Sequence, residues 1–192
     1  MNKIKDLITE PSEENKFGIL AYKLMHGIEI DGKWLKLVKN NDPKSVNDKC
    51  IYDVDYRITE DGETIGYLDI EQKQKWLSGG WPYHKTNVPR YPMGQWQRHE
   101  FDGRLTNKLL RFQEKPNMSF WVGVSLDYKR CQVVPALYIF NFGVETTQET
   151  EYDEMPLPIY EVPNRFCTYC ENADQFTNTI TEWYQNVYLA NK

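Results

Sequence analysis

The chain has 192 residues, of which 40% are hydrophobic and 27% charged, a composition typical of one folded domain with its own core. Its 28 acidic against 23 basic side chains give a net charge of −5, so it lacks the overall basic excess of a dedicated nucleic-acid coat protein. An aromatic content of 14% excludes a disordered or low-complexity chain.

Targeting signals are not evident in the sequence. No stretch approaches the length of an apolar membrane span, and residues 1–8 alternate charged with isolated apolar residues instead of forming a signal-peptide core. We therefore expect a cytoplasmic protein without a membrane partner. A single domain is predicted over residues 1–192, with residues 145–192 forming an acidic C-terminal extension and helix within it.

The first predicted elements are a helix and a hairpin. Ser12 is a candidate N-cap, acidic residues follow it, and a set of apolar residues then recurs at helical spacing up to Gly27. The members of that set are Phe17, Leu20, Ala21, Leu24 and Met25. Residues 28–38 predict a short strand or a hairpin that turns at Asp31 and Gly32.

A second hairpin carries most of the functional signal. Two strands are predicted at about residues 50–59 and 64–73, and the turn between them contains Gly62. Strand alternation puts Tyr67, Asp69, Glu71 and Lys73 on one face, whereas Leu68, Ile70 and Gln72 face the other side, where the apolar residues join the core. Because Asp53 and Asp55 share a face of the first strand, the hairpin can display either beside Glu71 and Lys73.

The remainder of the chain predicts an α/β or α+β domain with a mixed central sheet flanked by helices. The elements expected in order are an ordered loop (77–96), a helix (105–112), two antiparallel strands (120–126 and 132–140), an acidic surface loop (145–164) and a final helix (173–189).

The charged face of the second hairpin has the composition of a metal-dependent phosphodiesterase site. Two carboxylates bind Mg²⁺ or Mn²⁺ as hard oxygen ligands, and an ammonium group beside them orients the attacking water or stabilises developing charge. The backbone carbonyl of Gln72, between Glu71 and Lys73, is a further candidate ligand for the same ion.

These residues resemble the PD-(D/E)XK nuclease superfamily of restriction endonucleases, junction resolvases and phage exonucleases. Asp53 matches the strand aspartate, and Glu71-Gln72-Lys73 matches the (D/E)XK element. The resemblance covers roughly the first 76 residues and implies a restriction endonuclease-like fold of phage or bacterial type. It implies that Asp53 and Glu71 hold the metal, that Lys73 is catalytic, and that Glu14, or Glu13, of the leading helix adds another ligand.

The match also departs from the superfamily pattern. Tyr52 stands where a proline is expected before the aspartate, and Asp55 is a rival to Asp53 on the same strand face. Asp69 adds another carboxylate to the reactive face. Asp55 and Asp69 are therefore candidate substitutes in the metal site. The alternative interpretation of the whole pattern is a solvated strand face that carries paired charges.

The charge of the chain is divided between two segments. Residues 72–115 carry nine basic and three acidic side chains, a net of +6, with five Trp and Tyr interleaved. Such a mixture suits phosphate contacts and base stacking, so nucleic acid, with DNA favoured, is the predicted partner. The candidate contacts are Lys75, Lys85, Arg90 and Arg98. Residues 145–182 carry a net of −8 and should face away from DNA.

The four cysteines are too scattered for a disulfide framework, and we expect them to be reduced. Cys167 and Cys170 have the spacing of half a zinc site or a redox pair, but two small buried residues are the favoured interpretation, and Cys50 or Cys131 joins them only if folding brings them together.

The sequence thus predicts a Mg²⁺-dependent nuclease, and leaves endo- or exonuclease activity and a homodimer open. The alternative is a non-catalytic phage or bacterial accessory protein that binds nucleic acid or a protein partner.

Overall fold

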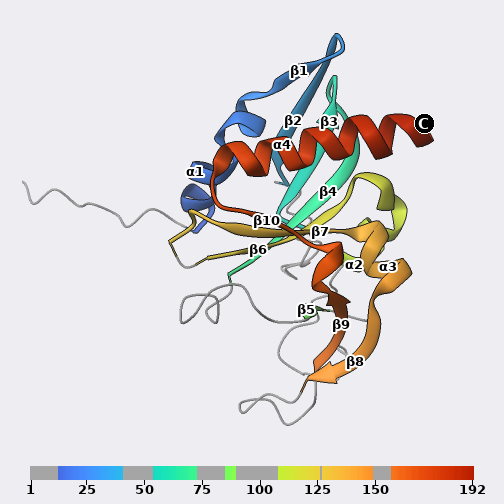
Figure 1. Ribbon diagram of the computed structural model, residues 1–192. Helices are drawn as coiled ribbons and strands as arrows, with labels where there is room; N and C mark the ends of the chain where they lie inside the picture. The colour runs from blue at the N-terminus through green and yellow to red at the C-terminus, as the bar shows by residue number, and fades with distance from the viewer. Residues whose placement is uncertain (1–12, 41–53, 73–84, 90–107, 126, 149–156) are drawn as a thin grey trace, which may run out of the picture.

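The computed structural model describes residues 13–40, 54–72, 85–89, 108–125, 127–148 and 157–192 (Figure 1). They form an α+β fold with a seven-stranded sheet in the order β1-β2-β3-β4-β6-β7-β10 and a three-stranded sheet in the order β5-β9-β8. Within the larger sheet β4 and β6 are parallel and the other neighbours are antiparallel. The predicted mixed sheet flanked by helices is confirmed.

The bounds of the elements are as follows. The larger sheet contains β1 (Ile28–Ile30), β2 (Lys33–Lys39), β3 (Tyr56–Glu60), β4 (Glu63–Gln72), β6 (Phe120–Val124), β7 (Cys131–Pro135) and β10 (Thr168–Cys170). The smaller sheet contains β5 (Lys85–Pro89), β8 (Val144–Gln148) and β9 (Leu157–Pro163). The helices are α1 (Glu13–His26), α2 (Lys108–Glu114), α3 (Ala136–Phe142) and α4 (Ala173–Trp183), and shorter helical turns are Pro116–Met118, Asn164–Phe166, Tyr184–Tyr188 and Leu189–Asn191.

Local sequence signals account for the first helix and both hairpins. Helix α1 ends where predicted, because Gly27 adopts φ +102° and donates its amide to the Lys23 carbonyl at 3.0 Å. The turns at residues 31–32 and 61–62 each place an aspartate and a glycine at positive φ, which matches the right-handed twist of the flanking strands. Both predicted hairpins are confirmed within the described residues.

The larger sheet is buried on two faces by two separate cores. Strand side chains such as Leu68 pack on one face against α1 and α4, through Phe17, Leu20, Phe176 and Ile180. On the other face Tyr67 and Trp121 pack against α2, α3 and the smaller sheet (Figure 1), through Phe112, Ile139, Tyr160 and Val162. The face that carries Tyr67, Asp69 and Glu71 is therefore covered near its centre.

Three sequence predictions are wrong. Residues 136–140 were expected to continue a strand but form α3, because seven largely apolar residues after Pro135 fit a helix as well as a strand. The predicted loop at 145–164 contains β8 and β9, and the predicted loop at 77–96 contains β5. Strand β5 pairs with β9 across a long stretch of chain, so local periodicity carries little trace of that pairing. Strands β8 and β9 are neighbours in the sequence and pair with each other in a segment that prolines interrupt.

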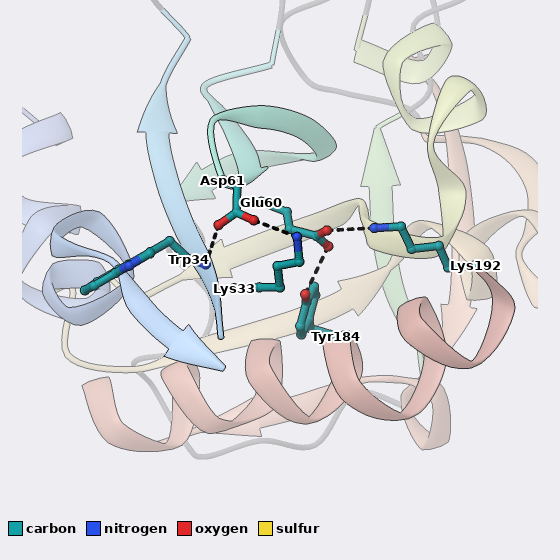
Figure 2. Close-up of polar contacts among 6 residues, drawn as sticks. All are labelled: Lys33, Trp34, Glu60, Asp61, Tyr184 and Lys192. Carbon is teal, nitrogen blue, oxygen red and sulfur yellow. Dashed lines mark hydrogen bonds and ion pairs between the residues drawn. The ribbon is translucent and has the colours of Figure 1, made fainter. Parts of the chain in front are cut away.

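Glu60, at the tip of the β3–β4 hairpin, binds the C-terminal helical segment through a hydrogen bond and an ion pair (Figure 2). The Tyr184 hydroxyl donates to Glu60 Oε2 at 3.0 Å, and Lys192 Nζ lies 2.6 Å from Oε1. Burial opposes ionisation of this carboxyl, but the two hydrogen bonds prevail and lower its pKa. The neighbouring Asp61 accepts from the Trp34 amide at 2.9 Å and pairs with Lys33.

Replacing Tyr184 by phenylalanine is expected to lower the free energy of unfolding by about 1–2 kcal/mol, because Glu60 loses a buried hydrogen bond to a charged acceptor. Urea denaturation near neutral pH measures this change. The matched control is Tyr22→Phe on the exposed side of α1, where Tyr22 is 46% exposed and little change is expected. Equal stability of the two variants would contradict a stabilising role for the Tyr184 contact.

Within the described residues no helix is both long and apolar enough to cross a membrane.

Candidate functional site

Asp55 is positioned at the start of β3 by contacts on both sides. Its Oδ2 atom accepts the backbone N–H of Ile70 on β4 at 2.7 Å. Asn40, which follows β2, donates its backbone N–H to the Asp55 carbonyl at 2.8 Å and its side-chain amide to the Val54 carbonyl at 3.1 Å. These bonds fix the entry to β3 and direct the Asp55 carboxylate toward the middle of β4.

Asp69 lies on β4 beside Asp55 and is buried, with 6% of the residue exposed. The Asp55 carboxyl lies within hydrogen-bonding reach of it. Burial and this neighbouring carboxyl raise the pKa of Asp69 to about 8, although Lys108 opposes the shift. The structure thus brings two carboxyl groups together in a poorly solvated place, where a proton or a cation must offset their repulsion.

Helix α2 supplies a cation to this pair. Lys108 Nζ lies 2.7 Å from Asp69 Oδ1. One turn later the Arg111 guanidinium lies 5.5 Å from the centre of the Tyr67 ring and 3.4 Å from Glu114 Oε2. Because residues three apart share a helix face, Lys108 and Arg111 both reach the sheet beside the two aspartates.

A row of polar side chains extends from β4 across the sheet. Glu71 follows Asp69 on the same face, about 7 Å farther along the strand. The register then aligns Glu71 with Gly123 on β6, Gln132 on β7 and Tyr169 on β10. Gln132 is 3% exposed and donates to the Tyr169 hydroxyl at 3.2 Å. The sheet therefore continues from the aspartates into a row of hydrogen-bonding groups.

The predicted site residues fall into three groups. Asp69 and Glu71 lie two residues apart on β4, and Asp55, just before β3, reaches β4 at the Ile70 amide and lies beside Asp69. Glu14 lies in the first turn of α1, Gln72 ends β4, and Lys85 begins β5. The remaining predicted residues lie outside the described part of the chain, and these are Asp53, Lys73, Lys75, Arg90 and Arg98.

Asn40 and Lys108 are parts of the site that the sequence did not predict. Asn40 acts through hydrogen bonds to the backbone carbonyls of Val54 and Asp55, which no motif encodes. Lys108 was counted in the basic segment, and its spacing of three from Arg111 on a predicted helix was the available signal. The spacing of Lys108 and Arg111 does not indicate which acidic strand their helix covers.

Two features bear on a divalent metal at this place. The oxygen donors of Asp55 and Asp69 are those that Mg²⁺ and Mn²⁺ prefer, and their mutual repulsion would be relieved by a cation. Across the ranges that the structure describes, no set of three or more His, Cys, Asp or Glu side chains is arranged to hold a metal ion. The described residues therefore supply two carboxylate ligands, Asp55 and Asp69, of a candidate divalent-metal site.

Comparisons with protein-family models, with curated proteins and with solved structures give no match to this chain.

Proposed function

We propose that the protein is a metal-dependent nuclease that hydrolyses phosphodiester bonds, with DNA as the favoured substrate and the cytoplasm of a bacterial or phage-infected cell as its location. The observation that carries this proposal is the proximity of two carboxyl groups, that of the partly buried Asp55 just before β3 and that of the buried Asp69 on β4. A purely structural core would gain stability by replacing one of them with an uncharged residue.

The resemblance to the PD-(D/E)XK superfamily supports this proposal, with one change in the assignment. Among the described residues Asp55 reaches the middle of β4, and Asp69 lies beside it there. We propose Asp55 and Asp69 as the metal ligands in this part of the site, with Glu71 as the next ligand along β4. A restriction endonuclease-like arrangement of the sheet belongs to the same proposal.

A bound Mg²⁺ would supply Lewis-acid stabilisation of the phosphate and a more acidic water. The residues of the chain have separate tasks. Asp55 is held by the Ile70 amide, so its carboxylate stays oriented toward Asp69. Lys108, 23% exposed along its side chain, can turn from Asp69 toward a phosphate oxygen while keeping contact with solvent. Lys73 retains the catalytic role that the resemblance implies.

One observation favours a second candidate, a non-catalytic protein that binds nucleic acid or a protein partner. Lys108 Nζ already lies 2.7 Å from Asp69 Oδ1, so the described residues contain an internal cation where a nuclease needs a metal. A protein that had lost catalysis could keep this ion pair as a structural element.

Metal-dependent cleavage distinguishes the two candidates. Purified protein should cut circular and linear DNA, or RNA, when Mg²⁺ or Mn²⁺ is present and not in EDTA. Lys73→Ala and Lys108→Ala should each lower the rate by about 10²–10⁴-fold, because each removes a cation expected beside the scissile phosphate. Gel or fluorescence assays under single-turnover conditions measure these rates.

The matched control is Lys129→Ala, which removes an exposed lysine in the β6–β7 turn and should leave the rate unchanged. The fold of each variant is checked by its thermal unfolding. Full activity in both Lys73→Ala and Lys108→Ala would contradict the assignment, and a protein that neither cuts nucleic acid nor gains thermal stability with Mn²⁺ would support the non-catalytic candidate.

A further inference from the structure

Cys131 and Cys170 face each other across two antiparallel strands at the edge of the larger sheet. Cys170 ends β10, which pairs with β7, and its Cα partner in that register is Cys131. Directly opposed residues in an antiparallel pair have Cα atoms roughly 4.5–5.5 Å apart, within the span of about 4.4–6.8 Å that a disulfide bridges. The backbone therefore needs no rearrangement to join the two sulfur atoms.

The two thiols already interact. Both residues are 0% exposed. The neighbouring Cys131 thiol lowers the pKa of the Cys170 thiol against the effect of burial, and the Thr179 hydroxyl lies 3.5 Å from the Cys170 sulfur. Burial raises the pKa of Cys131, so Cys170 is the more readily ionised member of the pair.

The spacing of Cys167 and Cys170 in the sequence suggests that they pair with each other, but the structure separates their roles. The Cys167 thiol is half-buried and points to the Pro163 carbonyl at 3.7 Å, whereas Cys170 is buried against Cys131. The three described cysteines are reduced, as expected from the sequence.

We propose that Cys131 and Cys170 form a redox-active pair, which a peroxide converts into a cross-strand disulfide. The Cys170 thiolate attacks a peroxide oxygen, and the O–O bond breaks to give a sulfenic acid and, after protonation, water. The Cys131 sulfur then attacks the sulfenic sulfur, its proton leaves with the hydroxyl as a second water, and the S–S bond forms. Two thiols and one hydrogen peroxide thus give one disulfide and two waters.

The location of the pair gives this bond a structural consequence. Strand β10 has three residues and is the edge of the sheet, so its opening exposes Cys170 with little loss of other structure. The strand leads into α4, whose Phe176 and Ile180 belong to the core. A disulfide would therefore hold the edge strand and the start of α4 against β7, one residue pair away from Gln132 and Tyr169.

Peptide mapping of the full-length protein tests the proposal without reference to nuclease activity. Treatment with excess hydrogen peroxide should make the protein lighter by two hydrogens and yield a peptide linked through Cys131 and Cys170. The linked protein should unfold at a temperature about 5–10 °C higher, and dithiothreitol should reverse both effects. Cys167→Ala should behave as the unmodified sequence does.

Cys170→Ala should give no intramolecular link through Cys131. A link between Cys167 and Cys170, oxidation of Cys131 or Cys170 to sulfinic acid without a link, or two thiols that stay unreacted in the folded protein would each overturn the proposal. Because the linkage is identified in the unaltered chain, the test stands even if an alanine variant fails to fold.

Discussion

Replacing Asp69 by asparagine is expected to stabilise the metal-free protein at alkaline pH and to abolish its response to Mg²⁺. The pKa of this carboxyl is raised to about 8 in the fold, against 3.8 for a solvated aspartate. Between these values the folded state holds a proton that the unfolded state has released, so the contribution of Asp69 to stability is present below pH 3.8 and is lost as the pH rises to about 8. An asparagine has no such dependence.

Above about pH 8 we expect Asp69→Asn to be more stable by a few kcal/mol, because one unit of pKa shift corresponds to about 1.4 kcal/mol. The loss of the contact with the partly exposed Lys108 offsets part of this gain. Urea denaturation in EDTA from about pH 5 to about pH 9 measures it as the difference between the two proteins. Asp174→Asn, at an exposed carboxylate paired with Lys23, is the control, and its difference should be small at every pH. A difference for Asp69→Asn that does not change with pH would contradict the buried carboxyl pair.

The same variant should lose cleavage by about 10³-fold or more if Asp69 is a metal ligand, because an amide is a weaker and uncharged ligand for Mg²⁺. A gain in stability together with a loss of cleavage would mean that the Asp69 carboxyl serves catalysis and lowers the stability of the fold. A gain in stability with unchanged cleavage would place the metal elsewhere.

Replacing Gly66 by alanine is expected to lower the free energy of unfolding by roughly 3–5 kcal/mol, although it adds only one methyl group. A Cβ atom at this position of β4 would lie 1.9 Å from the Met118 carbonyl oxygen and 2.5 Å from its carbon. The backbone there cannot yield easily, because Asn117 accepts from the Trp183 indole at 2.7 Å and Ser119 accepts from the Tyr67 amide at 3.1 Å.

A matched control for this variant is Gly18→Ala. Gly18 lies inside α1, and a Cβ there would meet only the Met25 sulfur, at 3.9 Å. Because alanine favours a helix interior, this variant should gain about 0.5–1 kcal/mol. Chemical denaturation of both variants measures the contrast. A cost of less than about 1 kcal/mol for Gly66→Ala would show that β4 does not approach residues 116–118 as closely as described.

The parts of the fold that the sequence predicts are those encoded locally. Helix α1 follows from apolar residues at helical spacing, and the hairpin turns follow from Asp31-Gly32 and Asp61-Gly62, which favour positive φ. Helix α4 follows likewise from Phe176 and Ile180, which are buried on its inner face. The shared strand face of Asp69 and Glu71 needs only alternation.

The remaining parts depend on contacts between distant segments. The smaller sheet pairs β5 with β9, about seventy residues away in the sequence, and nothing in either strand specifies that partner. Lys108, the cation of the candidate site, could not be predicted for the same reason, because its contact with Asp69 joins distant segments. Lys108 reaches Asp69 only because α2 packs over β4, and the burial of Asp69, which raises its pKa, comes from that packing.

If Asp55 and Asp69 bind a divalent cation, a crystal soaked in Mn²⁺ should reveal it. We expect an anomalous density peak within coordination distance of one oxygen of each carboxylate, with Lys108 displaced from Asp69. Well-ordered Asp55 and Asp69 side chains without a peak between them, at saturating Mn²⁺ and a pH above the pKa of about 8, would contradict it.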